Sequence, residues 1–193
     1  MNRLLFRSIL VLTLSLLIAA GDARAQFGSG GIMQLPDTEF IEFVKQGKTE
    51  EVSRALIRGQ SPNTSDSNAR TALMYAAAGG NVEIVQLLAK NKANVRLRDK
   101  QGNSALYWAV VSGHEEVVEA LVQVGAPVND PDRQGTTPLM VAARRGFEGV
   151  VRQLLAAKAD VNATDHTGRT ALMWSKDGRN PQVQKLLMAA GAR

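Results

Sequence analysis

The chain has 193 residues, a formal net charge of +5 and 45% hydrophobic residues, which suits one globular domain. It contains no cysteine, which excludes disulfides, thiolate metal sites and cysteine nucleophiles. The positive charge is too small to predict nucleic-acid binding, and the low aromatic content of 5% predicts a core of aliphatic and small side chains.

The N-terminus has the three parts of a secretory signal peptide. Arg3 and Arg7 precede an apolar run over residues 8–20, and Ala23 and Ala25 then occupy the small-residue positions of a cleavage site. We predict a signal peptide over residues 1–25, cleaved after Ala25. The alternative is an uncleaved N-terminal anchor, but the apolar run of 13 residues is short for a membrane-spanning helix.

Cleavage would remove three arginines and one aspartate, which lowers the formal net charge from +5 to +3. The exported, cysteine-free chain is then expected in a bacterial periplasm, where thiols are oxidised, without stable membrane insertion. The Gly-rich residues 26–36 lack helical periodicity and are predicted to be a flexible leader.

From residue 37 onward the sequence repeats with a period of 33 residues. Framework residues recur at this step without an insertion, which indicates a solenoid of similar units. The recurring sets include Thr71, Ser104, Thr137 and Thr170; Leu73, Leu106, Leu139 and Leu172; Ala76, Ala109, Ala142 and Ser175; Leu88, Leu121, Leu154 and Leu187; and Asp66, Asp99, Asp132 and Asp165.

Each unit predicts two helices followed by a turn. The Thr or Ser is suited to cap the N-terminus of a short helix, and the Leu and Ala residues share one apolar face of that helix. A second helix follows, with Val and Leu on its apolar face, and an Asp-x-x-Gly sequence then predicts a turn, as at residues 132–135 and 165–168.

This unit resembles the ankyrin repeat, and residues 135–146 (Gly-Thr-Thr-Pro-Leu-Met-Val-Ala-Ala-Arg-Arg-Gly) match its motif best. The resemblance implies an all-α solenoid of about five helix-turn-helix units with β-turn fingers. The expected units are residues 37–66, 67–99, 100–132, 133–165 and 166–193, of which the first and last act as caps. The motif's turn-bracing His is replaced by Met74, Tyr107, Met140 and Met173, which predicts looser turns and apolar filling of the space by methionine.

No residues form a catalytic, cofactor-binding or metal-binding pattern. His114 and His166 lie in different units without nearby paired acids, and no Gly-rich phosphate loop is present. The Asp residues that recur with the period suggest either acid–base chemistry or turn caps. We favour turn caps, because Asp commonly bonds the backbone of such turns.

The resemblance implies that a partner binds the turn tips and the concave face of the first helices. The predicted partner-binding residues are Arg70, Lys100, Gln101, Asn103, Arg133, Gln134, Arg144, Arg145 and Arg169. Six of them are cations, which predicts an acidic protein surface as the partner. The alternative is that these cations only keep the surface soluble.

A second column runs through Tyr75, Trp108, Val141 and Trp174. Such a stripe is either a binding hot spot or part of the core between units, and we favour the core.

We therefore expect a monomeric, non-enzymatic protein that mediates protein–protein interaction in the periplasm. The resemblance implies a role as a scaffold, as a protective partner of a periplasmic enzyme, or as an immunity protein against a toxin, and the residues do not select among these. Two other classes stay open: an enzyme hidden in the stack, and a binder of an anionic polymer or lipid surface.

Overall fold

Ten α-helices alternate with short loops along residues 35–193, which are the residues that the computed structural model describes. The predicted signal peptide, its cleavage after Ala25 and most of the predicted leader lie outside the described residues. The helices are α2 (Asp37–Lys45), α3 (Thr49–Ile57), α4 (Ala72–Ala78), α5 (Val82–Lys90), α6 (Ala105–Ser112), α7 (Glu115–Gln123), α8 (Pro138–Arg145), α9 (Glu148–Ala156), α10 (Ala171–Asp177) and α11 (Pro181–Ala189).

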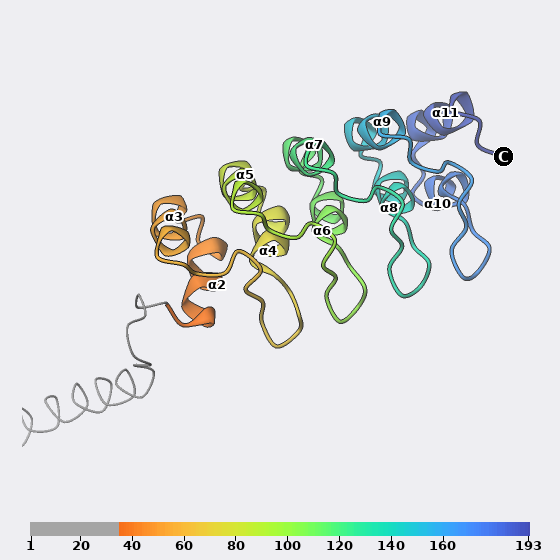
Figure 1. Ribbon diagram of the computed structural model, residues 1–193. Helices are drawn as coiled ribbons and strands as arrows, with labels where there is room; N and C mark the ends of the chain where they lie inside the picture. The colour runs from red at the N-terminus through yellow and green to blue at the C-terminus, as the bar shows by residue number, and fades with distance from the viewer. Residues whose placement is uncertain (1–34) are drawn as a thin grey trace, which may run out of the picture. The chain divides into compact units, whose positions relative to one another are not determined.

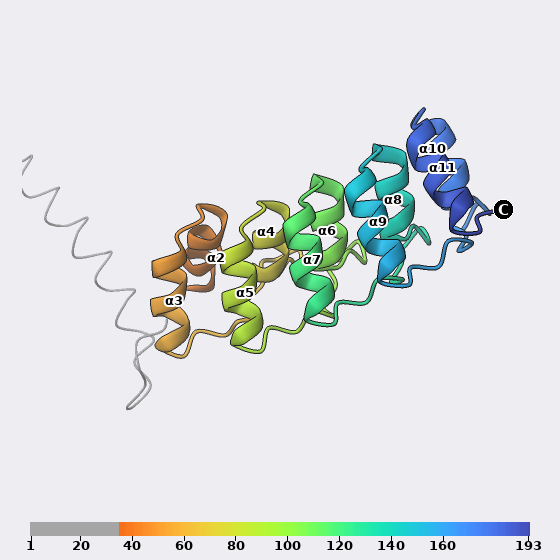
Figure 2. The same ribbon diagram turned by 90° about the horizontal axis from the view of Figure 1, so that it is seen from above.

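The helices form five pairs that stack side by side (Figures 1 and 2). Helices α2, α4, α6, α8 and α10 make one layer, and their partners α3, α5, α7, α9 and α11 make the other. Four loops, which we call the first to fourth fingers, project beside the first layer between successive units (Figure 1). They lie around residues 66–71, 99–104, 132–137 and 165–170. Within the described residues, β pairing is limited to isolated bridges, so the expected all-α solenoid is confirmed.

The predicted N-caps open the first helix of units two to five. In each of these helices the Thr or Ser side chain accepts a hydrogen bond from the backbone N–H three residues later, which satisfies one of the unpaired N–H groups at the helix start. The bonds are Met74 N to Thr71 Oγ1 (3.3 Å), Tyr107 N to Ser104 Oγ (3.2 Å), Met140 N to Thr137 Oγ1 (3.4 Å) and Met173 N to Thr170 Oγ1 (3.5 Å).

The methionines that replace the motif histidine do more than fill space. Met74 and Met140 are buried, and their Sδ atoms accept the backbone N–H of Thr71 and Thr137 at 3.5 and 3.4 Å. The thioether is a weak acceptor, but it forms a hydrogen bond where the loss of the motif histidine was expected to leave none. The expected role as purely apolar filling is therefore incomplete for these two residues.

Small and aliphatic residues repeat through the core because each unit buries the same faces. The Leu residues at 88, 121, 154 and 187 and the small residues at 76, 109, 142 and 175 are all fully buried. Ala and Ser at the latter positions let neighbouring first helices approach closely, and the first unit joins the same core through Phe40 and Val44.

The fingers are held in register by hydrogen bonds from each finger to the next. Lys100 N donates to Asn68 O, Arg133 N to Gln101 O, and His166 N to Gln134 O, at 3.0–3.2 Å. The turn tips from which a partner was expected to be bound are thus fixed relative to one another.

The first finger contains a residue with a strained backbone, and a substitution can relieve that strain. Ala69 has a φ of 59°, whereas Gly102, Gly135 and Gly168 occupy the corresponding left-handed position in the other fingers. We expect Ala69→Gly to raise the free energy of unfolding by about 0.5–1 kcal/mol, measured by urea denaturation.

The reverse change provides the control for Ala69→Gly. Gly135→Ala should lower stability, because its Cβ would lie 2.9 Å from His166 N and φ is +81°. An unchanged or lower stability of Ala69→Gly would show that the first finger is not strained.

Candidate partner-binding groove

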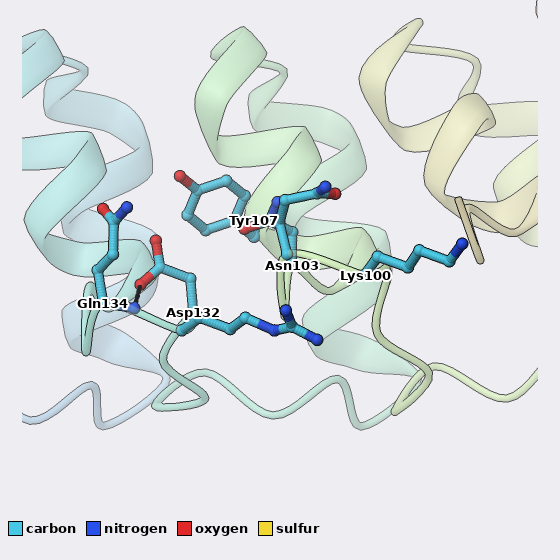
Figure 3. Close-up of a pocket in the computed structure, with 7 residues that line it drawn as sticks. Lys100, Asn103, Tyr107, Asp132 and Gln134 are labelled. Atoms are coloured by element: carbon cyan, nitrogen blue, oxygen red, sulfur yellow. Dashed lines mark hydrogen bonds between the residues drawn. The ribbon is translucent and has the colours of Figure 1, made fainter. Parts of the chain in front are cut away.

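Two adjoining cavities lie between the second and third fingers and the helices α6, α8 and α10, and we refer to them together as the groove. Their volumes are about 350 and 310 Å³, and they share Asn103, Tyr107, Asp132 and Gln134 in their linings. Figure 3 shows Tyr107, Asn103 and Lys100 on one side of the first cavity and Asp132 and Gln134 on the other. The groove therefore runs across units rather than within one.

Seven of the nine residues predicted to bind a partner line the groove. The second finger and its flank supply Lys100, Gln101 and Asn103, the third finger supplies Arg133 and Gln134, and the end of α8 supplies Arg144 and Arg145. The structure thus brings together segments about 40 residues apart. Arg70 and Arg169 lie outside the groove lining.

The two cations outside the groove lining are engaged within the protein. Arg70 lies with its guanidinium 4.0 Å from the centre of the Trp108 ring and its Nε 3.7 Å from Asp99 Oδ2. Arg169 forms an ion pair with Asp177 and lies over the ring of Trp174. Their charges are largely compensated, so the predicted cationic surface is smaller than the six charges suggested.

The four cations of the groove remain available. Lys100, Arg133, Arg144 and Arg145 are exposed, and none of them forms an ion pair with another residue in the range 35–193. Arg144 rests 5.3 Å from the centre of the Trp174 ring, which restrains its side chain. Asp132 supplies the one carboxylate among the lining residues, so the groove has a positive balance.

The recurring Asp residues are turn caps, as the sequence favoured. One carboxylate oxygen of each accepts the backbone N–H groups two and four residues later, at 2.8–3.0 Å. These bonds hold each finger in its turn. An Asp committed in this way is poorly suited to acid–base catalysis.

The aromatic column has a role that the sequence prediction missed. Each ring packs against the core and donates a hydrogen bond to the second oxygen, Oδ2, of a finger Asp. The bonds are Tyr75 Oη to Asp66 (2.7 Å), Trp108 Nε1 to Asp99 (3.1 Å) and Trp174 Nε1 to Asp165 (2.9 Å). The signal for these pairs was present in the sequence as an Asp nine residues before each aromatic residue.

These hydrogen bonds lower the pKa of two of the carboxyl groups, those of Asp66 and Asp165. Burial raises the pKa of Asp165, but hydrogen bonds from the Thr167 hydroxyl, the Arg169 N–H and the Trp174 indole outweigh it and leave the pKa below its usual range. For Asp66, burial likewise raises the pKa, and the Tyr75 hydroxyl and backbone N–H bonds lower it by more.

Acid should therefore destabilise the fold. A carboxyl group with a folded-state pKa below its unfolded value stabilises the protein above that unfolded value, about 4, and loses this contribution as the pH falls through the folded-state pKa. We expect the free energy of unfolding to fall from pH 5 to pH 3 in urea titrations. Asp165→Asn should flatten this decline, and an identical decline in the variant would contradict the assignment to Asp165.

Tyr107 also lines both cavities, although the sequence singled it out only as a residue that stands in place of the motif histidine. Its ring stands edge-on to Trp108, with 6.2 Å between the centroids. Burial raises the pKa of the Tyr107 hydroxyl, the charges of Asp132 and Asp99 raise it further, and Arg145 lowers it. The phenol thus stays neutral and can both donate and accept hydrogen bonds in the groove.

Neither histidine lines the groove. The Nε2 atom of His114 lies 3.1 Å from Ala78 O and links the second and third units. His166 bonds the neighbouring finger through its backbone. Over residues 35–193 no three His, Asp or Glu side chains are grouped to hold a metal ion, and no helix in this range has the length and apolar character to cross a bilayer.

Comparison with known proteins gives one family. The family model described as ankyrin repeats (3 copies) matches residues 40–132 and 124–193, which together cover most of the chain and every lining residue of the groove. No curated protein matches the chain.

Proposed function

The chain belongs to the ankyrin-repeat family, whose repeats generally mediate protein–protein interaction, and on this premise we propose that it is a non-catalytic binding module of the bacterial periplasm. The groove is its binding site, and the partner is a protein with an acidic surface. The protein acts as a monomer that scaffolds its partner, or protects or neutralises it.

The observation that carries this proposal is the charge balance of the groove. Four exposed cations and one carboxylate line the groove, and the cations lack ion-pair partners among residues 35–193. Unpaired charges around a preformed groove favour an oppositely charged surface through faster association and a defined orientation. Surface cations that served solubility alone would not need to converge on one groove.

The test is capture of the partner from a periplasmic extract by the tagged protein, quantified by mass spectrometry. Capture of an enzyme or a toxin would assign a protective or immunity-type role. If instead anionic vesicles or polyanions bind with strong salt dependence and no protein is enriched, the protein binds an anionic polymer or lipid surface.

The periplasmic location rests on the N-terminal sequence. We expect mass spectrometry of the protein from fractionated cells to show a chain that begins at Gln26, found in the periplasmic fraction. Ala25→Leu should block this cleavage because the processing site requires a small residue. Recovery of the wild-type chain with residues 1–25 still attached would contradict the proposed signal peptide.

A further inference from the structure

The series of aromatic–carboxylate pairs along the stack, which we call the ladder, is interrupted at one position. Units two, three and five each place an aromatic donor against the finger Asp that lies nine residues earlier. In unit four the corresponding residue is Val141, which carries no hydrogen-bond donor and is buried. The third finger therefore has the carboxylate of the ladder, Asp132, but no ring of the described residues stands against it.

The carboxylate left without a ring is Asp132. Its Oδ1 accepts the N–H groups of Gln134 and Thr136 at 2.8 Å, as in the other fingers. Its Oδ2 receives no hydrogen bond from any residue of the range 35–193, whereas Asp99 and Asp165 each accept one from a tryptophan. Asp132 is half-buried, while Asp99 and Asp165 are buried, with 5% and 8% of their surfaces exposed.

The place of the missing ring is a cavity. Trp108, Val141 and Trp174, from three successive units, line the 310 Å³ cavity together with Asp132. This volume is at the lower end of the range for ligand pockets, about 300–1,000 Å³, and suits one side chain better than a cofactor. We call this part of the groove the notch.

We propose that the notch receives a tryptophan side chain from an acidic segment of the partner, with the indole N–H donating to Asp132 Oδ2 and completing the ladder. This inference rests on the proposed function, because it specifies how the partner enters the same groove. Tryptophan is the donor that the protein itself uses in the two flanking units.

The surroundings of the notch specify the rest of the segment. Arg144 and Arg145 line the same cavity, and Lys100 and Arg133 line the adjoining one, so acidic residues on either side of the tryptophan would meet cations. A buried aromatic anchor inside a rim of charge pairs is the arrangement that concentrates binding energy in protein interfaces. A phenylalanine would fill the space but leave the carboxylate oxygen desolvated without a donor.

The test uses the protein purified from cells that express the full chain and three capped peptides of sequence Asp-Glu-X-Glu-Asp. X is tryptophan, 1-methyltryptophan, which lacks the N–H, or phenylalanine. Binding is measured by calorimetry and by the NMR shifts of the backbone amides in the third finger. We expect the tryptophan peptide to bind at least about tenfold more tightly than the other two, because they leave a charged acceptor unpaired.

A variant that supplies the ring from within the protein gives the second measurement. Val141→Trp keeps every groove cation and should lower the affinity for the tryptophan peptide at least about tenfold, since the new indole would occupy the notch. Trp already stands at this repeat position in the third and fifth units, and the NMR spectrum reports whether the fold is kept. If this variant does not fold, the comparison of the three peptides on the wild-type protein decides the proposal.

The outcomes separate this inference from the proposed function. Equal binding of the three peptides, or no binding of any, would overturn the notch proposal even if capture of the natural partner depends on Arg144 and Arg145. If capture of the natural partner does not depend on Arg144 and Arg145, the proposed binding site itself is wrong.

Discussion

Reversing both charges at the end of α8, in the double variant Arg144→Glu and Arg145→Glu, should lower the affinity for the partner at least about 100-fold. Close charge pairs across protein interfaces contribute about 1.5–7 kcal/mol, and the double reversal replaces two attractions by two repulsions. Both side chains are exposed and line the groove, so the fold should lose little more than the contact of Arg144 with Trp174. The measurement is the amount of partner captured, followed by the dissociation constant once the partner is purified.

The matched control reverses two exposed arginines that do not line the groove. Arg58→Glu with Arg96→Glu makes the same change in net charge, and neither side chain forms an ion pair within residues 35–193. Partner capture should persist in this control. Equal loss of capture in both double variants would mean that total charge, and not the groove, determines binding.

Asp99→Ala should be the most destabilising change in the ladder, lowering the free energy of unfolding by about 3–5 kcal/mol. Asp99 accepts hydrogen bonds from two backbone N–H groups, from Asn103 Nδ2 and from Trp108 Nε1, and Arg70 Nε lies 3.7 Å away. Removing the carboxylate would leave buried donors and a half-buried cation without a partner. Urea denaturation followed by circular dichroism measures the loss.

Asp132→Ala is the control for the contacts that Asp99 makes beyond its turn cap. Asp132 caps its finger with the same two backbone bonds but lacks the indole, the Asn side chain and the arginine. We expect it to cost about 1–2 kcal/mol. Equal losses for Asp99→Ala and Asp132→Ala would show that the contacts of Asp99 with Trp108, Asn103 and Arg70 add nothing to the stability of the stack.

The fold could be predicted from the sequence because each unit repeats the same local chemistry. Thr71 and Thr137 cap helices through bonds that span three residues, and Leu88 and Leu121 are buried because they recur on one helical face. These signals need no knowledge of the neighbouring unit. The role of the Asp residues as turn caps was predictable for the same reason, since their bonds span two to four residues.

The candidate site was only partly predictable, because the residues packed around a charged side chain decide whether it is free to bind a partner. Arg70 and Arg145 look equivalent in the sequence, but Arg70 contacts Asp99 of the second finger and Trp108 of the next first helix, while Arg145 lines the groove. Trp108 was expected in the core, and it does pack there, but its indole edge also bonds a finger. Contacts of this kind depend on the separation and orientation of adjacent units.

By itself the sequence determined the 33-residue period, the helix pairs, the caps, the aliphatic core and the positions where cations gather, since all of these follow from residue type and spacing. The tertiary structure alone decided which cations stay unpaired, which residues form one groove, and that Asp132 keeps an oxygen free where Asp99 and Asp165 do not. The physical reason is that hydrogen bonds and ion pairs act over a few ångströms, and only the stacking of units brings side chains from different repeats within that distance.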